Sequence, residues 1–125
     1  MNKTALVVDD NQNNLLLEKD LLEVAGFKVL EATTGESGIA MARRERPDLV
    51  IMDVRLPDMR GSVAAKILRQ GPYPYEGTII FVTASVLAEG RKELEDIVNT
   101  GFIGKPINTR TFAREVLQYC GGQLS

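Results

Sequence analysis

Five side chains that can do chemistry each follow a short apolar run in this 125-residue chain: Asp9, Asp10, Asp53, Thr83 and Lys105. The runs before them have the length and the β-branched content of buried strands. Because the carboxyl ends of parallel strands meet at one rim of a sheet, we expect these side chains to lie together. The sequence therefore predicts a polar site with three carboxylates, one hydroxyl and one ammonium group.

The residue types at this predicted site suit a metal ion and a phosphoryl group. Three neighbouring carboxylates repel one another, which raises the pKa of at least one of them unless a cation lies between them. A ligand set made only of oxygens suits Mg²⁺, which takes one or two carboxylates and keeps several waters. Mg²⁺ alone would leave Lys105 and Thr83 unexplained, whereas a phosphoryl group uses both an ammonium charge and a hydroxyl donor. A carboxylate beside Mg²⁺ can form an aspartyl phosphate, and Asp53 is the central candidate because its strand lies in the middle of the rim.

Each of these residues also has an ordinary structural interpretation. Asp10 or Asn11 can cap the helix that follows, and Asp53 can start a turn. Thr83 is a good strand former, and a lone Lys105 is usually a solvated surface charge. Their joint placement at the ends of separate strands favours the functional interpretation.

Short β-branched runs alternate with longer helical stretches along the chain, which is typical of an α/β fold. Consecutive apolar residues at 5–8 and 49–52 indicate central parallel strands that are covered on both faces. Right-handed crossovers then give a doubly wound sheet flanked by helices. The expected strands are Thr4–Val8, Lys28–Ala32, Leu49–Met52, Thr78–Val82 and Gly101–Gly104. The expected helices are Asn13–Ala25, a helix from Gly35 that ends before Pro47, 61–70, Ala88–Asn99 and Thr109–Cys120, with a Gly-Pro-Tyr-Pro-Tyr loop at 71–75.

The composition excludes several classes of site. The chain has no histidine and one cysteine, Cys120. These two facts exclude Ser-His-Asp and Cys-His catalysis, histidine metal centres, CxxC redox pairs and structural zinc sites. The length and the 44% of hydrophobic residues fit one globular domain that needs no disulfide.

The charge distribution argues against nucleic-acid binding by this chain. The formal net charge is -2, and the basic residues are scattered apart from the short Arg-Arg-Glu-Arg run at 43–46. The apolar residues at 5–8 are far too few for a signal peptide or a membrane span. We therefore expect a reducing, cytoplasmic environment and no contact with a membrane.

Taken in order, the motifs make the chain resemble a receiver domain of the two-component response regulators, from about Thr4 to Cys120. The matching segments are LVVDDN at 6–11, PDLVIMD at 47–53, LPDMRG at 56–61, VTAS at 82–85 and GKPI at 104–107. Each segment is a modest signal alone, but their order and spacing are specific. The resemblance implies a single CheY-like domain over residues 1–125, with a five-stranded parallel sheet in the flavodoxin-like order 2-1-3-4-5 and five helices.

The resemblance also implies roles for the site residues. Asp53 would accept a phosphoryl group from the phosphohistidine of a sensor histidine kinase or of a histidine phosphotransfer protein. Asp10, Asp53 and the backbone carbonyl of Arg55 would bind Mg²⁺ directly, and Asp9 would help through water. Lys105 would pair with the phosphoryl oxygens.

The same resemblance implies a conformational switch. Thr83 would move to hydrogen-bond a phosphoryl oxygen, and Phe102 would turn inward as the aromatic half of the switch. Without the resemblance, Phe102 is interpreted as a core residue. Pro106 would follow a cis peptide bond, which would aim Lys105. Output would pass to a downstream protein by binding, at a surface formed by the last two helices and the last strand, including Tyr119.

Three positions differ from the commonest family pattern or lie where the family varies. The chain has Met59-Arg60-Gly61 where relatives often have Met-Asp-Gly. This keeps the glycine that permits the turn and makes the rim less acidic. Arg55 and Ser85 each follow a motif residue by two positions, where the side chain influences water access and the lifetime of the phosphoryl group.

The first expected helix carries two apolar stripes. One contains Leu15, Leu22 and Ala25, and the other contains Leu17, Leu21 and Val24. One stripe must face the sheet, and the spare apolar area suits either a helical partner or a partly covered core edge. The sequence leaves open which stripe faces outward.

Three other functions fit parts of the pattern. A Mg²⁺-dependent aspartyl-phosphate phosphatase of the haloacid dehalogenase type also uses a strand-end aspartate, but it would want a second aspartate where Arg55 stands. A flavodoxin-like flavin protein would want a loop rich in Ser, Thr and Gly where Asp9 and Asp10 would repel a phosphate. A receiver-like interaction module that no longer phosphorylates would not need the intact aspartates, threonine and lysine.

Overall fold

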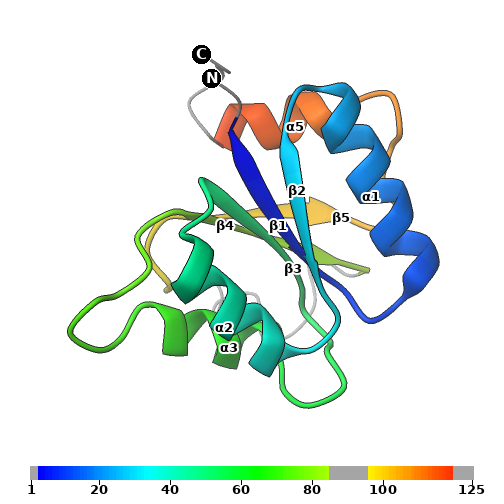
Figure 1. The fold of residues 1–125 in the computed structure, drawn as a ribbon. Helices are drawn as coiled ribbons and strands as arrows, with labels where there is room; N and C mark the ends of the chain where they lie inside the picture. Colours follow the sequence, from blue (N-terminus) through cyan, green and yellow to red (C-terminus); the bar gives the residue numbers. More distant parts are fainter. Residues whose placement is uncertain (1–2, 85–95, 120–125) are drawn as a thin grey trace.

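The computed structural model describes residues 3–84 and 96–119, and within them five strands and four helices form three layers (Figure 1). The strands are β1 (Thr4–Val8), β2 (Lys28–Ala32), β3 (Leu49–Asp53), β4 (Thr78–Thr83) and β5 (Thr100–Gly104). The helices are α1 (Gln12–Val24), α2 (Gly35–Glu45), α3 (Gly61–Leu68) and α5 (Phe112–Tyr119). Every strand pair is parallel and the order is β2-β1-β3-β4-β5, which confirms the predicted sheet.

The central strands are buried on both faces, as their continuous apolar runs predict. All of β3 is buried, and so is β1 from Ala5 onward. Alternate side chains point to opposite faces of a sheet. Leu6 and Val50 therefore belong to the core under α2 and α3. Val7 and Ile51 belong to the core under α1 and α5.

Side-chain caps set where two of the helices begin. Asn11 precedes α1 and its side chain accepts a hydrogen bond from the Asn14 backbone N–H at 3.0 Å. Thr34 and Ser37 form a reciprocal capping box at the start of α2. The other end of α2 is closed by Arg46 in the left-handed conformation, with φ of 49°. These caps place α1 directly after the Asp9-Asp10 pair.

Two helices are shorter than the sequence predicts. α3 ends at Leu68 rather than near Gln70, because the Leu68 carbonyl accepts the backbone N–H of Tyr75 from the following loop at 2.7 Å. α5 begins at Phe112 rather than Thr109. Asn108 accounts for this later start, since its side chain accepts the Arg110 N–H and holds 108–111 in turns. Cys120 lies outside the described residues.

The predicted helix Ala88–Asn99 lies mostly outside the described residues. Its described part, 96–99, forms turns instead of helix, and Asn99 has a φ of 57° in the left-handed region. Here the prediction extended the helix too far. No helix in the described part of the chain has the length and apolar character needed to cross a membrane.

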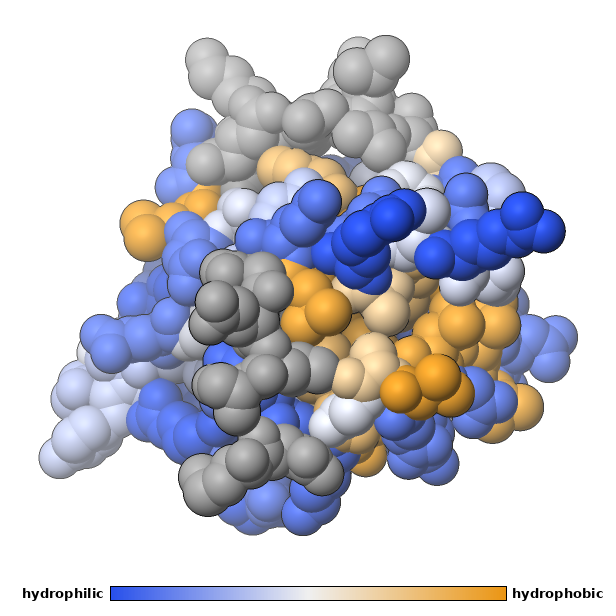
Figure 2. Space-filling view, turned by 90° about the horizontal axis from the view of Figure 1, so that it is seen from above, coloured by the Kyte–Doolittle hydropathy of each residue, from blue (hydrophilic) through white to orange (hydrophobic). Residues whose placement is uncertain are grey.

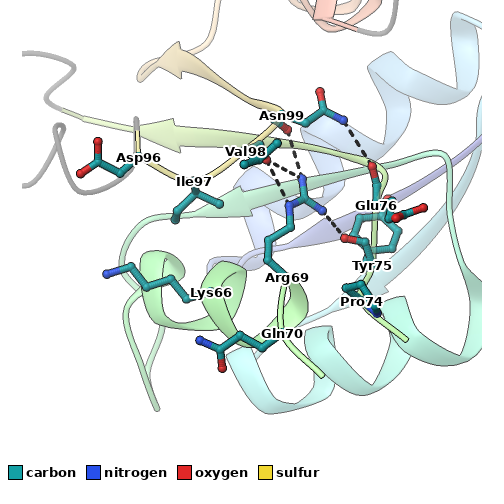
Figure 3. A pocket seen from close by; sticks show the side chains of 10 residues that line it. All are labelled: Lys66, Arg69, Gln70, Pro74, Tyr75, Glu76, Asp96, Ile97, Val98 and Asn99. Carbon is teal, nitrogen blue, oxygen red and sulfur yellow. Dashed lines mark hydrogen bonds between the residues drawn. The ribbon is translucent and has the colours of Figure 1, made fainter. Parts of the chain in front are cut away.

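Arg69 joins the end of α3 to the segments that lead into β4 and β5 (Figure 3). Its guanidinium donates to the carbonyls of Tyr75 and Gly77 before β4 and to those of Val98 and Asn99 before β5. A guanidinium has five donors in a fixed plane, so one side chain can hold two backbone segments at once. Arg69 therefore fixes where β4 and β5 start.

Candidate functional site

The carboxyl ends of β1, β3 and β5 bring together Asp9, Asp53 and Lys105, as the sequence predicts. Lys105 Nζ lies 2.9 Å from Asp53 Oδ2 and 3.7 Å from Asp9 Oδ2. One carboxylate oxygen each from Asp9, Asp10 and Asp53 lies within 4.8 Å of the others. Thr83 ends β4 beside them, and its carbonyl accepts the Lys105 backbone N–H at 2.8 Å. The structure thus gathers Asp9, Asp10, Asp53 and Lys105 at one rim, and Thr83 ends the strand next to them.

Backbone N–H groups hold the carboxylates of Asp9 and Asp53 in place. Asp9 Oδ1 accepts the Asn11 N–H at 2.9 Å, and Asp53 Oδ1 accepts the Arg55 N–H at 3.1 Å. Both contacts span two residues, a local pattern that aspartate forms readily in turns. The other oxygen of each carboxylate, Oδ2, is the one that faces Lys105. The same local geometry therefore aims both carboxylates at the ammonium group.

Burial and charge act against each other at this rim. The pKa of Asp9 is raised overall, mainly because the side chain is buried. The Asn11 hydrogen bond and the Lys105 charge lower this pKa, and the neighbouring Asp53 raises it. Burial lowers the pKa of Lys105, but its hydrogen bond to Asp53 and the nearby carboxylates outweigh burial and raise it. Lys105 therefore stays charged, and the carboxylates of Asp9 and Asp53 share its positive charge.

Glu18 on α1 is a fourth carboxyl at this site, and we did not predict it. Its side chain is 2% exposed and lies close enough to Asp9 for that carboxylate to raise its pKa. Burial, followed by the charge of Asp9, raises its pKa to about 8. Positions 15, 18 and 22 share one helix face, and Leu15 and Leu22 are both buried. That spacing is the sequence signal that places Glu18 toward the sheet.

The loop after β3 connects the site to α2. The Gly61 N–H donates to the Val54 carbonyl at 2.8 Å and closes the loop. Asp58 in this loop accepts the backbone N–H groups of Gly35 and Glu36 at the start of α2, at 2.8 and 2.9 Å. Hydrogen bonds from Glu36 and Gly35 lower the pKa of Asp58. Asp58 therefore caps α2 across the loop, a contact between distant segments that no local sequence pattern indicates.

The predicted switch residues lie on the two strands next to the site. Phe102 on β5 is half-buried, with its ring centroid 6.0 Å from that of Phe81, its partner on β4. Thr83, also half-buried, is two residues further along β4. Tyr119 of α5 donates a hydrogen bond to the Phe102 carbonyl at 3.0 Å. The peptide bond between Lys105 and Pro106 is cis.

The donor set at the rim fits Mg²⁺. The three clustered groups are carboxylates, so every ligand atom they offer is a hard oxygen. Asp10 is exposed, which leaves that side of the cluster open to the waters that Mg²⁺ retains.

Comparison with known proteins finds one family model and many proteins of the same fold. The family model of the response regulator receiver domain matches residues 5–117. The chain is 30% identical over 121 residues to the polar-differentiation response regulator DivK of Brucella anthropi, covering 97% of this chain and 98% of that protein. The chemotaxis response regulator CheY4 of Vibrio cholerae superposes with a TM-score of 0.88 at 27% identity, covering 95% of this chain and 99% of that one. The receiver domain of the sensor histidine kinase PA1611 of Pseudomonas aeruginosa, solved with a magnesium ion in its active-site cleft, gives 0.85 at 27% identity, covering 97% and 99%.

Proposed function

Because the chain belongs to the response regulator receiver domain family, we propose that it is a signalling switch that accepts a phosphoryl group on Asp53. In this proposal one receiver domain spans residues 1–125, and the donor is a sensor histidine kinase or a histidine phosphotransfer protein. The contact of Lys105 Nζ with Asp53 Oδ2 at 2.9 Å carries the proposal. It places a fixed positive charge where the transferred phosphoryl oxygens would lie.

The transfer itself needs little from the protein beyond position and charge. An oxygen of Asp53 attacks the phosphorus, the phosphorus–nitrogen bond of the donor's phosphohistidine breaks, and its electron pair leaves with the imidazole. Asp10, Asp53 and the Arg55 carbonyl would hold Mg²⁺, with Asp9 acting through water. When bound, the ion supplies charge that offsets the phosphoryl oxygens. Lys105 supplies the remaining positive charge from the protein.

Phosphorylation would change the surface around β5 and α5. Thr83 would move to donate a hydrogen bond to a phosphoryl oxygen, and Phe102 would turn inward. Two contacts support this route: the Phe102 ring lies 6.0 Å from the tilted ring of Phe81, on the strand that ends at Thr83, and the Tyr119 hydroxyl donates to the Phe102 carbonyl. A downstream protein would then bind the β5 and α5 surface, including Tyr119.

We place the docking surface for the phosphoryl donor on α1. Its Leu17, Leu21 and Val24 stripe faces outward, with Val24 90% exposed and Leu17 38% exposed, while Leu21 still touches the core. Figure 2 looks onto the α1 and α5 side and shows apolar side chains gathered between polar ones. The stripe runs along α1 away from the phosphoacceptor rim, where the helix begins, and such a stripe suits a helix of a kinase or phosphotransfer bundle.

The alternative function, a phosphatase, has weaker support, because position 55 lacks the second carboxylate that a phosphatase would need. Arg55 stands where a second carboxylate would act as acid and base, and its side chain is exposed. Its backbone N–H is already bound to Asp53 Oδ1. The proposal therefore treats the chain as a switch that is phosphorylated and dephosphorylated, rather than as a turnover enzyme.

Incubation with acetyl phosphate and Mg²⁺ is expected to add one phosphoryl group to the protein, read as intact mass. Asp53→Asn should abolish the gain, because the amide is a poor nucleophile. Chelation of Mg²⁺ with EDTA should abolish it as well. Asp20→Asn is the matched control, since Asp20 is an exposed carboxylate on α1. No gain in the wild type would indicate a module that no longer phosphorylates, and rapid turnover of acetyl phosphate without accumulation would indicate a phosphatase.

Arg55→Ala is expected to speed dephosphorylation. The exposed side chain follows Asp53 by two residues, so its removal opens the phosphoryl group to water. We expect a rate increase of about fivefold, equivalent to about 1 kcal/mol of barrier. Decay of the phosphorylated mass after removal of acetyl phosphate measures the rate, with Arg60→Ala as the control from the same loop. An unchanged decay rate in Arg55→Ala would rule out this role.

A further inference from the structure

A hollow of about 510 Å³ lies where α2 ends and the 69–77 loop begins. The end of α2 lies at the opposite end of the sheet from the carboxyl end of β3, which carries Asp53 (Figure 1). The residues that line it are Arg43, Arg46, Gln70, Gly71, Pro72 and Tyr73. It joins two sequence features that the phosphoacceptor site does not use, the basic run at 43–46 and the Gly-Pro-Tyr-Pro-Tyr loop. None of its lining residues is acidic.

Two arginines are held in place at this hollow while most of their donors stay available. Arg43 Nη2 donates to the Ile67 carbonyl at 2.9 Å. Arg46 donates to the carbonyls of Pro74 and Tyr73 at 3.0 and 3.1 Å. Each guanidinium has five N–H donors, so these contacts fix its position and leave donors free for a ligand.

The positive charge of Arg43 and Arg46 is not balanced locally. Among residues 3–84 and 96–119, no carboxylate lies within ion-pair distance of either guanidinium. Arg44 between them is different, because it pairs with Glu45 at 2.9 Å. An anion that enters the hollow would therefore meet two fixed cations.

Tyr73 adds a rigid aromatic surface at the edge of the same hollow. Its side chain is 78% exposed, it lies between two prolines, and its carbonyl is held by Arg46. Tyr75 anchors the loop, since it is buried and its Oη donates to the Pro47 carbonyl at 2.7 Å. Gly71 leaves open space, with nothing within 4 Å of where a Cβ would lie. A flat group can therefore stack on the Tyr73 ring at little entropic cost.

The neighbouring hollow around Arg69 lacks these properties (Figure 3). Arg69 donates to four backbone carbonyls, and the acidic Glu76 and Asp96 also line that hollow. Its arginine is thus occupied and its charge is offset. Of the two hollows, the one at Arg43, Arg46 and Tyr73 is therefore better suited to an anionic ligand.

We propose that this hollow binds a nucleoside phosphate, with the phosphate on Arg43 and Arg46 and the base stacked on Tyr73. Arginine forks match phosphate oxygens in pairs, and an aromatic ring offers a face to any base. The Gln70 amide can hydrogen-bond the base edge. The hollow is open, since all six residues that line it are exposed, so a bound nucleotide would stay partly in contact with water. The site shares no residue with the phosphoacceptor rim.

The test is a titration of ¹⁵N-labelled protein with AMP, adenosine and inorganic phosphate, followed by NMR in EDTA so that the rim holds no metal ion. We expect AMP to shift the signals of residues 43–46 and 70–73 and to bind about tenfold more tightly than either fragment. Arg43→Ala should weaken AMP binding about tenfold. Tyr73→Ala should weaken AMP binding and leave phosphate binding unchanged.

Arg44→Ala is the matched control, and its AMP affinity should equal that of the wild type. Arg43→Gln removes the charge but keeps a donor for the Ile67 carbonyl, so it serves if Arg43→Ala does not fold. Three results would each overturn the proposal. The first is that AMP at about 10 mM shifts no signal. The second is that AMP and phosphate bind with equal affinity and that Tyr73→Ala changes neither affinity. The third is that a hexaglutamate peptide shifts the signals of the hollow and AMP does not.

Discussion

Glu18→Gln is expected to raise the free energy of unfolding of the metal-free protein at pH 8 by on the order of 3 kcal/mol. Glu18 is 2% exposed and its pKa rises from 4.5 to about 8, first because of burial and then because of the charge of Asp9. A buried carboxylate beside a second carboxylate opposes folding once it ionises. Glutamine keeps the shape and can donate a hydrogen bond to Asp9 without ionising.

The direction of the pH dependence follows from the raised pKa. The folded protein binds this proton more tightly than the unfolded chain, so the stabilisation is complete below pH 4.5 and is lost as the pH rises through about 8. Asp9, whose pKa is also raised, acts in the same direction. The raised pKa of Lys105 matters only in the alkaline range, above its ordinary value of 10.5. Wild-type stability should therefore fall between pH 5 and 8, and the fall should be smaller in Glu18→Gln.

Urea unfolding in EDTA at pH 5, 6.5 and 8 measures this slope for the wild type and Glu18→Gln. Glu23→Gln is the matched control, because Glu23 is exposed on the same helix and should leave the slope unchanged. The two proteins should have nearly equal stability at pH 5 and should diverge toward pH 8. Equal slopes for the wild type and Glu18→Gln would show that Glu18 keeps an ordinary pKa in the folded protein.

The sequence is sufficient to predict which residues lie at the carboxyl edge of the sheet, because the end of a strand is marked by a local sequence pattern. Apolar runs at 5–8 and 49–52 predict central strands, and the residues that follow them fall at the carboxyl edge by topology alone. Asp9, Asp53 and Lys105 were placed correctly on that basis, and their contacts are found in the structure. The sequence does not decide which stripe of α1 faces outward, because both stripes are apolar.

Contacts between distant segments could not be predicted in the same way. Arg46 reaches the Pro74 carbonyl 28 residues away, and Asp58 caps α2 from 22 or 23 residues away. Glutamate is common on solvated helix faces, so Glu18 looked ordinary although its position matches the buried Leu15 and Leu22. In each case tertiary packing decides what the side chain does, and no local pattern records it.

Gly61→Ala is expected to lower both the free energy of unfolding and the rate of phosphorylation, because the added methyl group would overlap the backbone of Asp53. A Cβ at Gly61 would lie 2.4 Å from the Asp53 carbonyl oxygen and 3.2 Å from Val54 Cα. Neither atom can rotate away as a side chain would, so the end of β3 must shift. We expect destabilisation of about 3 kcal/mol, as for other overpacked sites.

The same shift should slow phosphorylation by acetyl phosphate at least about tenfold, since small displacements of reacting groups are costly. Asp53 would move relative to Lys105, whose Nζ now lies 2.9 Å from its carboxylate. Gly71→Ala is the matched control: its Cβ meets nothing within 4 Å, although its φ of +93° costs a side chain about 1 kcal/mol. Urea unfolding and the rate of mass gain separate the two effects. Phosphorylation of folded Gly61→Ala at the wild-type rate would show that β3 absorbs the clash without moving Asp53.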